Sequence, residues 1–130
     1  VYNTNHSPFH ATEGPENFKL VDLTMGYETL ENNRSMRFAE LVKQYDKVSY
    51  EDFKRIKYDG RYPQKFSFAI DIDSLFSLNA DQYPQVADLI QQLKQWDRNS
   101  DVQNTGATIF AHINYQIYAL ARQGKRPPVL

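Results

Sequence analysis

The sequence predicts a mainly α-helical chain with one or two short strands. Apolar residues recur at helical spacing in three segments, about residues 30–45, 81–97 and 105–123. Between the first two, the spacing from Ser49 to Asp52 is typical of a capping box and predicts a fourth, shorter helix. Alternation with a period of two, the pattern of strands, occurs only near the N-terminus and over residues 66–72.

The first nine residues are predicted to form a strand that ends in an Asn-rich turn closed by Pro8. Short amides at the end of a strand can point from a rigid scaffold into a cleft and donate hydrogen bonds to a developing charge. Asn3 and Asn5 would point the same way, since side chains alternate along an extended chain. The alternative is that both asparagines only satisfy backbone groups of the turn.

Residues 10–29 are predicted to be a long loop, because neither period holds there and Gly14-Pro15 marks a turn. Long loops in compact domains are usually functional or packed against other parts of the protein. From the residues alone, Glu16 is a solvated acidic side chain of this loop. A helical part is expected to follow over residues 30–126.

The first predicted helix runs from about Leu30 to Tyr45, and one face of it should be buried. That face is formed by Phe38, Leu41, Val42 and Tyr45. Arg34 lies in the first turn, where the helix dipole disfavours a cation by ~0.3 kcal/mol or more, so its presence needs a reason. The ordinary reason is an ion pair with Glu28 or Glu31. Arg37, one turn later, is either solvated or supports a neighbouring carboxylate.

A short helix from about Tyr50 to Tyr58 should follow, because Ser49 can cap it and Asp59-Gly60 can end it. The alternation over residues 66–72 fits a strand, but apolar residues there also fit a helical face, so both interpretations stay open.

Two longer helices complete the chain. In the segment from Asp81 to Asp97, Asp81 can cap the helix and Pro84 is tolerated in the first turn. In the last helix, Thr105 can be the cap and Gly124 the end. The aromatic residues of this last helix are expected to pack in the core.

Composition excludes several classes of function. The net charge of −1 leaves no basic surface for nucleic acid, and no apolar run approaches the ~20 residues of a membrane span. Without cysteine there is no disulfide, thiolate metal site or cysteine nucleophile, and the three histidines lack the spacing of a zinc motif. Because the chain begins without Met and finishes on Arg126-Pro127-Pro128-Val129-Leu130, we expect a piece of a longer protein.

Two stretches resemble a known family. Asn3-Thr4-Asn5-His6-Ser7-Pro8-Phe9 is similar to the Asn-x-Asn-x-x-Pro-aromatic segment of the penicillin acylase (penicillin amidase) family of N-terminal-nucleophile hydrolases. Glu31-Asn32-Asn33-Arg34-Ser35-Met36-Arg37, followed by Leu41-Val42 and then by Val48-Ser49-Tyr50-Glu51-Asp52-Phe53, is similar to a helical block downstream in that family. The agreement covers roughly residues 1 to 60.

The resemblance implies that the chain is a helical fragment cut from a four-layer αββα sandwich, from the nucleophile-bearing subunit. The implied nucleophile is an N-terminal Ser outside this chain, whose own α-amine (pKa ~7.7–8) acts as the base. The implied donor to the oxyanion is Asn5, with Asn3 as the alternate, and the implied supporting residue is Arg34. The implied substrate is an acyl amide, of the β-lactam side-chain or N-acyl homoserine lactone type.

The resemblance also implies that no cofactor takes part in the chemistry. It implies a structural calcium site in the full-length protein, with Glu16 as the candidate ligand, and a periplasmic or secreted location. The implied partner is the remainder of the same precursor, so the isolated fragment should be inactive. The competing hypothesis is a small helical interaction module that binds a partner through a Tyr-rich surface and has no catalytic activity.

Overall fold

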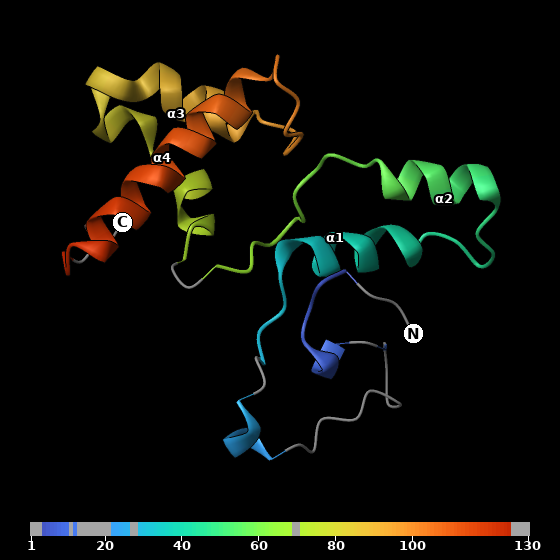
Figure 1. The fold of residues 1–130 in the computed structure, drawn as a ribbon. Coiled ribbons are helices and arrows are strands. Elements are labelled where there is room, and N and C mark those ends of the chain that lie inside the picture. Colours follow the sequence, from blue (N-terminus) through green and yellow to red (C-terminus); the bar gives the residue numbers. More distant parts are fainter. Residues whose placement is uncertain (1–3, 11, 13–21, 27–28, 69–70, 126–130) are drawn as a thin grey trace. The chain divides into compact units, whose positions relative to one another are not determined.

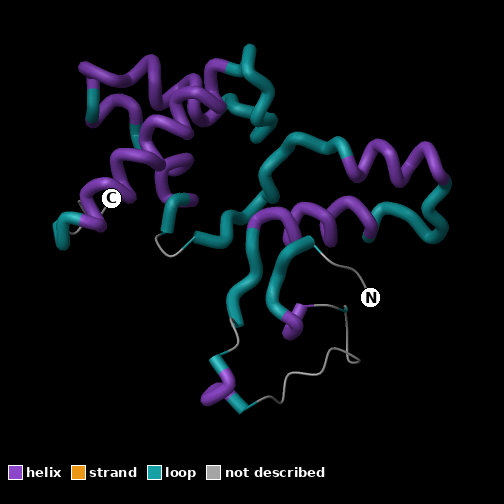
Figure 2. The backbone as a smooth tube through the Cα atoms, viewed as in Figure 1, coloured by secondary structure: helices purple, strands orange, loops and turns teal. Residues whose placement is uncertain are grey.

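The computed structural model is helical in the part of the chain that it describes, and this confirms the predicted fold class (Figure 1). The described residues are 4–10, 12, 22–26, 29–68 and 71–125. They include no β-strand (Figure 2). The chain divides into two compact units, residues 1–69 and residues 70–130, and each unit is described by itself.

The first unit is built on a helical hairpin. Helices α1 (Asn33–Val42) and α2 (Tyr50–Lys57) lie side by side (Figure 1). Two single turns of 3₁₀ helix, η1 (Pro8–His10) and η3 (Leu23–Met25), precede them. Of the strand and turn predicted over residues 1–9, residues 4–9 form the turn and the start of η1, and residues 1–3 lie outside the described part.

Helix α1 is shorter than the predicted helix over residues 30–45. Asn32 has extended backbone (φ −102°, ψ 161°) and caps the helix, so residues 30–32 are outside it. The apolar face predicted to be buried is only half-buried. The facing helix α2 has eight residues and is therefore only ~12 Å long, so it covers part of that face.

The capping box of α2 is confirmed. The side chain of Ser49 accepts a hydrogen bond from the backbone N–H of Asp52 at 3.1 Å, and Asp52 accepts one from the N–H of Ser49 at 3.1 Å. Within the unit α2 buries Ile56, whereas Phe53 remains 50% exposed.

The segment whose conformation the sequence left open is neither strand nor helix over residues 66–68. Phe66 is buried, with its ring 5.3 Å from both Tyr62 and Phe68. The side chain of Asn33 accepts a hydrogen bond from the backbone N–H of Ser67 at 2.6 Å, which uses the ladder donor that a strand would need. Residues 69 and 70 lie outside the described part.

The second unit packs helices α3 (Ala87–Lys94) and α4 (Thr105–Arg122) against short 3₁₀ turns. These turns are η4 (Asp73–Ser77), η5 (Ala80–Gln82) and η6 (Pro84–Val86). The apolar side chains of its core are all buried to less than one tenth exposure; they are Ile72, Leu75, Ile90, Leu93, Trp96 and Phe110.

The α-helix predicted to start at Asp81 begins six residues later, at Ala87. Pro84 disfavours the helical conformation of the preceding residue, and Tyr83 has φ −133° and ψ 62°. The segment before α3 therefore breaks into η5 and η6. Asp81 is not a cap; its N–H is itself capped by the side chain of Asn79 at 3.1 Å.

The N-cap of α4 is Asn104 rather than Thr105, because the Asn104 side chain accepts from the N–H of Ala107 at 3.1 Å. The predicted end at Gly124 is confirmed. Gly124 has φ 69°, its N–H donates to Ala121, and the N–H of Lys125 donates to Leu120. This pair of bonds is the Schellman motif, in which glycine takes the left-handed position.

Trp96 and Phe110 stack with ring centroids 4.9 Å apart, and Trp96 lies against Gly106 in the first turn of α4. A Cβ atom on Gly106 would lie 2.5 to 2.7 Å from three Trp96 side-chain atoms. The close approach of α4 to Trp96 therefore requires glycine at this position.

Gly106→Ala should destabilise the protein by about 1–3 kcal/mol through overpacking. In an unconstrained helix the same change stabilises by up to ~1 kcal/mol, so the sign of the effect is diagnostic. Urea unfolding of wild type and variant measures it. A more stable variant would contradict the contact between Trp96 and Gly106.

Candidate functional site

Asn5 lies at an exposed bend in left-handed backbone, with φ 59°. Asparagine tolerates this conformation better than most residues with a side chain. Next to it, the backbone N–H of Thr4 donates to Nδ1 of His6 at 3.0 Å, and Oγ1 of Thr4 lies 2.7 Å from the same nitrogen. Because Nδ1 of His6 accepts, the histidine has a structural part in the turn.

The turn is anchored by two buried residues, Ser7 and Phe9. The carbonyl of Ser7 accepts from the N–H of His10 at 3.0 Å, which closes η1. Pro8 occupies the first position of η1, where its lack of an N–H has no cost. The bend at Asn5 therefore leads directly into a packed segment.

The start of α1 is fixed by Asn32 and Ser35. The Oδ1 atom of Asn32 accepts from the backbone N–H of Ser35 at 2.8 Å, and Oγ of Ser35 donates to the carbonyl of Asn32 at 2.8 Å. Ser35 is fully buried. The first bond satisfies one of the N–H groups that a helix N-terminus otherwise leaves unpaired, and the second ties the hydroxyl of Ser35 to the capping residue.

The same Asn32 side chain connects α1 to the bend. Its Nδ2 donates to the carbonyl of Asn5 at 2.8 Å and to that of Thr4 at 3.3 Å. The bond to Asn5 spans 27 positions in the sequence. The bend that carries Asn5 and the turn of α1 that carries Arg34 are thus held by one amide.

Arg34 is exposed in the first turn of α1 and lines a hollow of about 270 Å³. Thr4, next to Asn5, lines the same hollow. The remaining lining combines an apolar part and a charged part: Phe38, Leu41, Phe53 and Ile56, with Arg37, Lys57, Asp59 and Arg61. The structure therefore brings Arg34 and the neighbour of Asn5 to one cavity.

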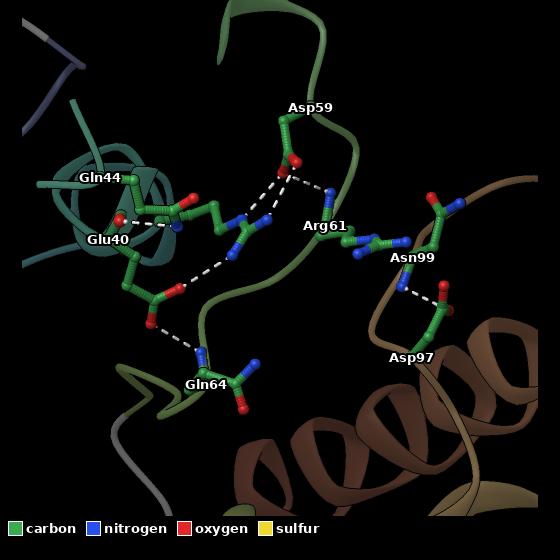
Figure 3. A network of polar contacts seen from close by, with 8 residues as sticks. Glu40, Gln44, Asp59, Arg61, Gln64, Asp97 and Asn99 are labelled. Atoms are coloured by element: carbon green, nitrogen blue, oxygen red, sulfur yellow. Dashed lines mark hydrogen bonds and ion pairs between the residues drawn. The ribbon is translucent and has the colours of Figure 1, made fainter. Parts of the chain in front are cut away.

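Arg37 forms ion pairs with Glu40 and Asp59, two of the residues labelled in the polar network of Figure 3. Its guanidinium binds both carboxylate oxygens of Asp59, each at 2.9 Å, and Glu40 at 3.1 Å. The backbone N–H of Gln64 donates to Glu40 at 2.8 Å, and that of Arg61 to Asp59 at 3.1 Å. Of the two interpretations for Arg37, support of a carboxylate is confirmed.

The electrostatics of this pair follow from its geometry. The hydrogen bonds from Arg37 hold the pKa of Asp59 below its ordinary value, and the hydrogen bond to Asp59 raises the pKa of Arg37. Their side chains are only 18% and 15% exposed. Both groups are therefore charged at neutral pH, and the chain from Asp59 to Gln64 is held to α1.

His10 contacts the segment that precedes α1. Its Nε2 donates to the carbonyl of Thr29 at 3.0 Å, because a carbonyl can only accept. Its Nδ1 lies 3.5 Å from the carboxylate of Glu31. Glu31 is one of the two partners predicted for Arg34; the other, Glu28, lies outside the described residues.

Two of the predicted site residues, Asn3 and Glu16, lie outside the described part of the chain. Among the residues that are described, no group of three or more His, Asp or Glu side chains is arranged to hold a metal ion. Calcium binding through Glu16 stays a prediction. No helix in the described part has the length and apolar character needed to cross a membrane.

The second unit has a cavity of about 500 Å³ between α3 and α4. Its lining is apolar except for Tyr83, Thr108 and His112. His112 is exposed, and the other titratable side chain in the lining is the phenol of Tyr83. This cavity offers shape and apolar contact, and its lining residues include no carboxylate that could act with His112.

Two residues of the first unit were not predicted to be part of the site, namely Asn32 and Asp59. The sequence held one signal for Asn32, because Asn is a preferred N-cap and stands three positions before Ser35. Its bond to Asn5 has no local signal. Asp59 was predicted only to end α2, and its pairing with Arg37 spans 22 positions.

The chain was compared with known proteins. The sequence model of the penicillin amidase family matches residues 1–125. No curated protein and no solved structure matches the chain.

Asp59→Asn should lower the free energy of unfolding by about 2 kcal/mol at pH 7, since it removes a charged hydrogen-bond partner of Arg37. The folded-state pKa of Asp59 is depressed, so its contribution is present above the unfolded pKa of ~3.9 and disappears as the pH falls through the folded-state value. The difference between wild type and variant should therefore shrink below about pH 4.

Urea unfolding between pH 7 and pH 3 measures this difference. Asp46→Asn, at an exposed position between α1 and α2, is the control for loss of one negative charge. A difference for Asp59→Asn that stays constant or grows towards pH 3 would contradict the pairing with Arg37.

Proposed function

Because the chain belongs to the penicillin amidase family, we propose that the full-length protein hydrolyses acyl amides with an N-terminal nucleophile. The family match over residues 1–125 carries this proposal. The link made by Asn32 supports it, since one amide holds the Asn5 bend and the turn of Arg34 together. We propose β-lactam side-chain amides or N-acyl homoserine lactones as the substrate type, and a periplasmic or secreted location.

The nucleophile is proposed to be a Ser, Thr or Cys exposed by internal cleavage of the precursor, outside residues 1–130. Its hydroxyl or thiol attacks the amide carbonyl while its own α-amine accepts the proton. An α-amine has an ordinary pKa of ~7.7–8, so this step needs no histidine near neutral pH.

Asn5 is proposed to donate a side-chain N–H to the oxyanion of the tetrahedral intermediate. Its exposed position at a bend suits contact with a substrate. A fixed donor of this kind contributes ~3 kcal/mol to the transition state, because it is already oriented where the charge develops. Asn3 is the alternate for this role.

Arg34 is proposed to steady Asn5 and the catalytic amine from the first turn of α1. A cation in that turn is disfavoured by the helix dipole, and the position is exposed. A functional role accounts for a residue that the helix itself does not favour.

The exposed apolar side chains of α2 and of its C-cap residue, Tyr58, are proposed to contact the remainder of the same precursor. Tyr50 and Tyr58 are each 74% exposed and Phe53 is 50% exposed. The alternative function, a helical interaction module without catalytic activity, would use the same surface. Terminal sequencing and intact mass of the mature subunit distinguish the two, since an uncleaved protein would contradict the hydrolase mechanism.

Replacing Asn5 should lower kcat for acyl p-nitroanilides about a hundredfold or more. Asn5→Gly is the sharpest variant, because glycine adopts φ 59° without strain and removes only the amide. Asn5→Ala should lose the same activity and some stability in addition. If Asn5→Gly has wild-type turnover, then Asn5 serves only the turn.

Arg34→Ala should lower kcat at least tenfold, while the free energy of unfolding stays the same or rises by ~0.3–1 kcal/mol as an unfavourable dipole interaction is removed. Paired activity and urea-unfolding measurements test it. Arg34→Lys keeps the charge without the planar fork and should retain part of the activity. Loss of stability together with activity would show that Arg34 is structural.

A further inference from the structure

We propose that Asn32 is a positioning residue for the hydrolysis, an inference that rests on the proposed function. It holds the bend of Asn5 at a fixed distance from the turn of α1 that carries Arg34. Asn32 itself makes no contact with the substrate in this proposal; it acts through the backbone of Asn5.

The side-chain amide of Asn32 can bind α1 and the bend at the same time. Asn32 uses both ends of its amide, Oδ1 toward the N–H of Ser35 and Nδ2 toward the carbonyls of Asn5 and Thr4. An amide places its acceptor and its donors on separate atoms, whereas a carboxylate has no donor and a hydroxyl has a single oxygen. Among the preferred N-cap residues, only asparagine carries an acceptor for the cap and a donor for the bend on two separate atoms.

Hydrogen bonds in the first turn of α1 hold Asn32 in place. Ser35 is fully buried and its Oγ returns a hydrogen bond to the carbonyl of Asn32 at 2.8 Å. The side chain of Asn33, the residue after Asn32, accepts a hydrogen bond from the N–H of Ser67 at 2.6 Å. Asn32 therefore cannot shift without breaking bonds in the first turn of α1.

The bond from Asn32 contributes to the position of the exposed bend at Asn5. Asn5 is exposed and has left-handed backbone, so burial does not fix its position. The bond from Asn32 to its carbonyl is 2.8 Å long and comes from an element 27 positions away. A displacement of ~1 Å at a reacting group typically costs about a hundredfold in rate, so such a bond has kinetic consequences.

Asn32→Asp separates the two functions of the side chain. Aspartate caps helices as well as asparagine does, so α1 should keep its start. It cannot donate to the carbonyls of Asn5 and Thr4. We expect kcat of the full-length protein for acyl p-nitroanilides to fall about ten- to a hundredfold, with KM within about twofold and a melting temperature within a few degrees of wild type.

Asn32→Ser is the second variant, because serine also caps but is too short to reach the bend while capping, and it adds no charge. It should reproduce the loss in kcat. Wild-type kcat in Asn32→Ser would attribute the effect of aspartate to its charge and overturn the proposal. Equal falls in kcat and in folded fraction for both variants would show a purely structural role and overturn it too.

Ser49→Ala is the matched control for capping. It removes the capping box of α2. The hydrogen bonds of Ser49 in that box are made with Asp52 and not with the bend. It should lower the melting temperature and leave kcat unchanged at temperatures below the melting transition.

Failure of this inference is separable from failure of the proposed function. A wild-type protein without amidase activity rejects both. If wild type is active, Asn5→Gly is inactive and the Asn32 variants are unaffected, only the positioning role is rejected.

Discussion

The order of the first unit depends on the side-chain amide that caps α1. Helices of fewer than ~12–15 residues are marginal in water by themselves, and α1 has ten. Its start is defined by Asn32, and the side chains around that start bind backbone groups of distant segments, the bend at Asn5 and the segment at Ser67. Hydrogen bonds from side chain to backbone therefore set the path of the chain where few apolar residues are buried.

The second unit is ordered by apolar contact. Trp96, Phe110 and Phe76 stack, and the indole N–H of Trp96 donates to the carbonyl of Asn99 at 2.8 Å. Arg98, in left-handed backbone with φ 63°, lies over the ring of Phe76 at 4.5 Å. Burial of large aromatic side chains contributes more free energy per residue than exposed hydrogen bonds do. The first unit is thus ordered mainly by hydrogen bonds from side chains to the backbone, and the second mainly by buried aromatic side chains.

The sequence predicted the helices because periodicity is a local property, and it missed their bounds where tertiary contacts or a single residue decided. Asn32 caps α1, which was expected to start at about Leu30, and Asn104 caps α4, for which Thr105 was the expected cap. Pro84 delays α3 to Ala87. Asn5 and Arg34 were selected through a family resemblance. The hydrogen bonds that relate them are long-range, and no local pattern contains a partner 27 positions away.

An oxyanion donor has to meet the substrate, so its side chain cannot be held by burial. Its own backbone is then a place where its position can be held, and the carbonyl of Asn5 is a group that Asn32 binds. From Asn32 to Arg34 the chain rises only ~3 Å along the helix axis, because each helical residue adds ~1.5 Å. A bond of 2.8 Å on one side and a rigid first turn on the other leave little freedom between the two proposed site residues. In this arrangement, exposure of Asn5 and precision of its placement are compatible, since the backbone supplies the precision.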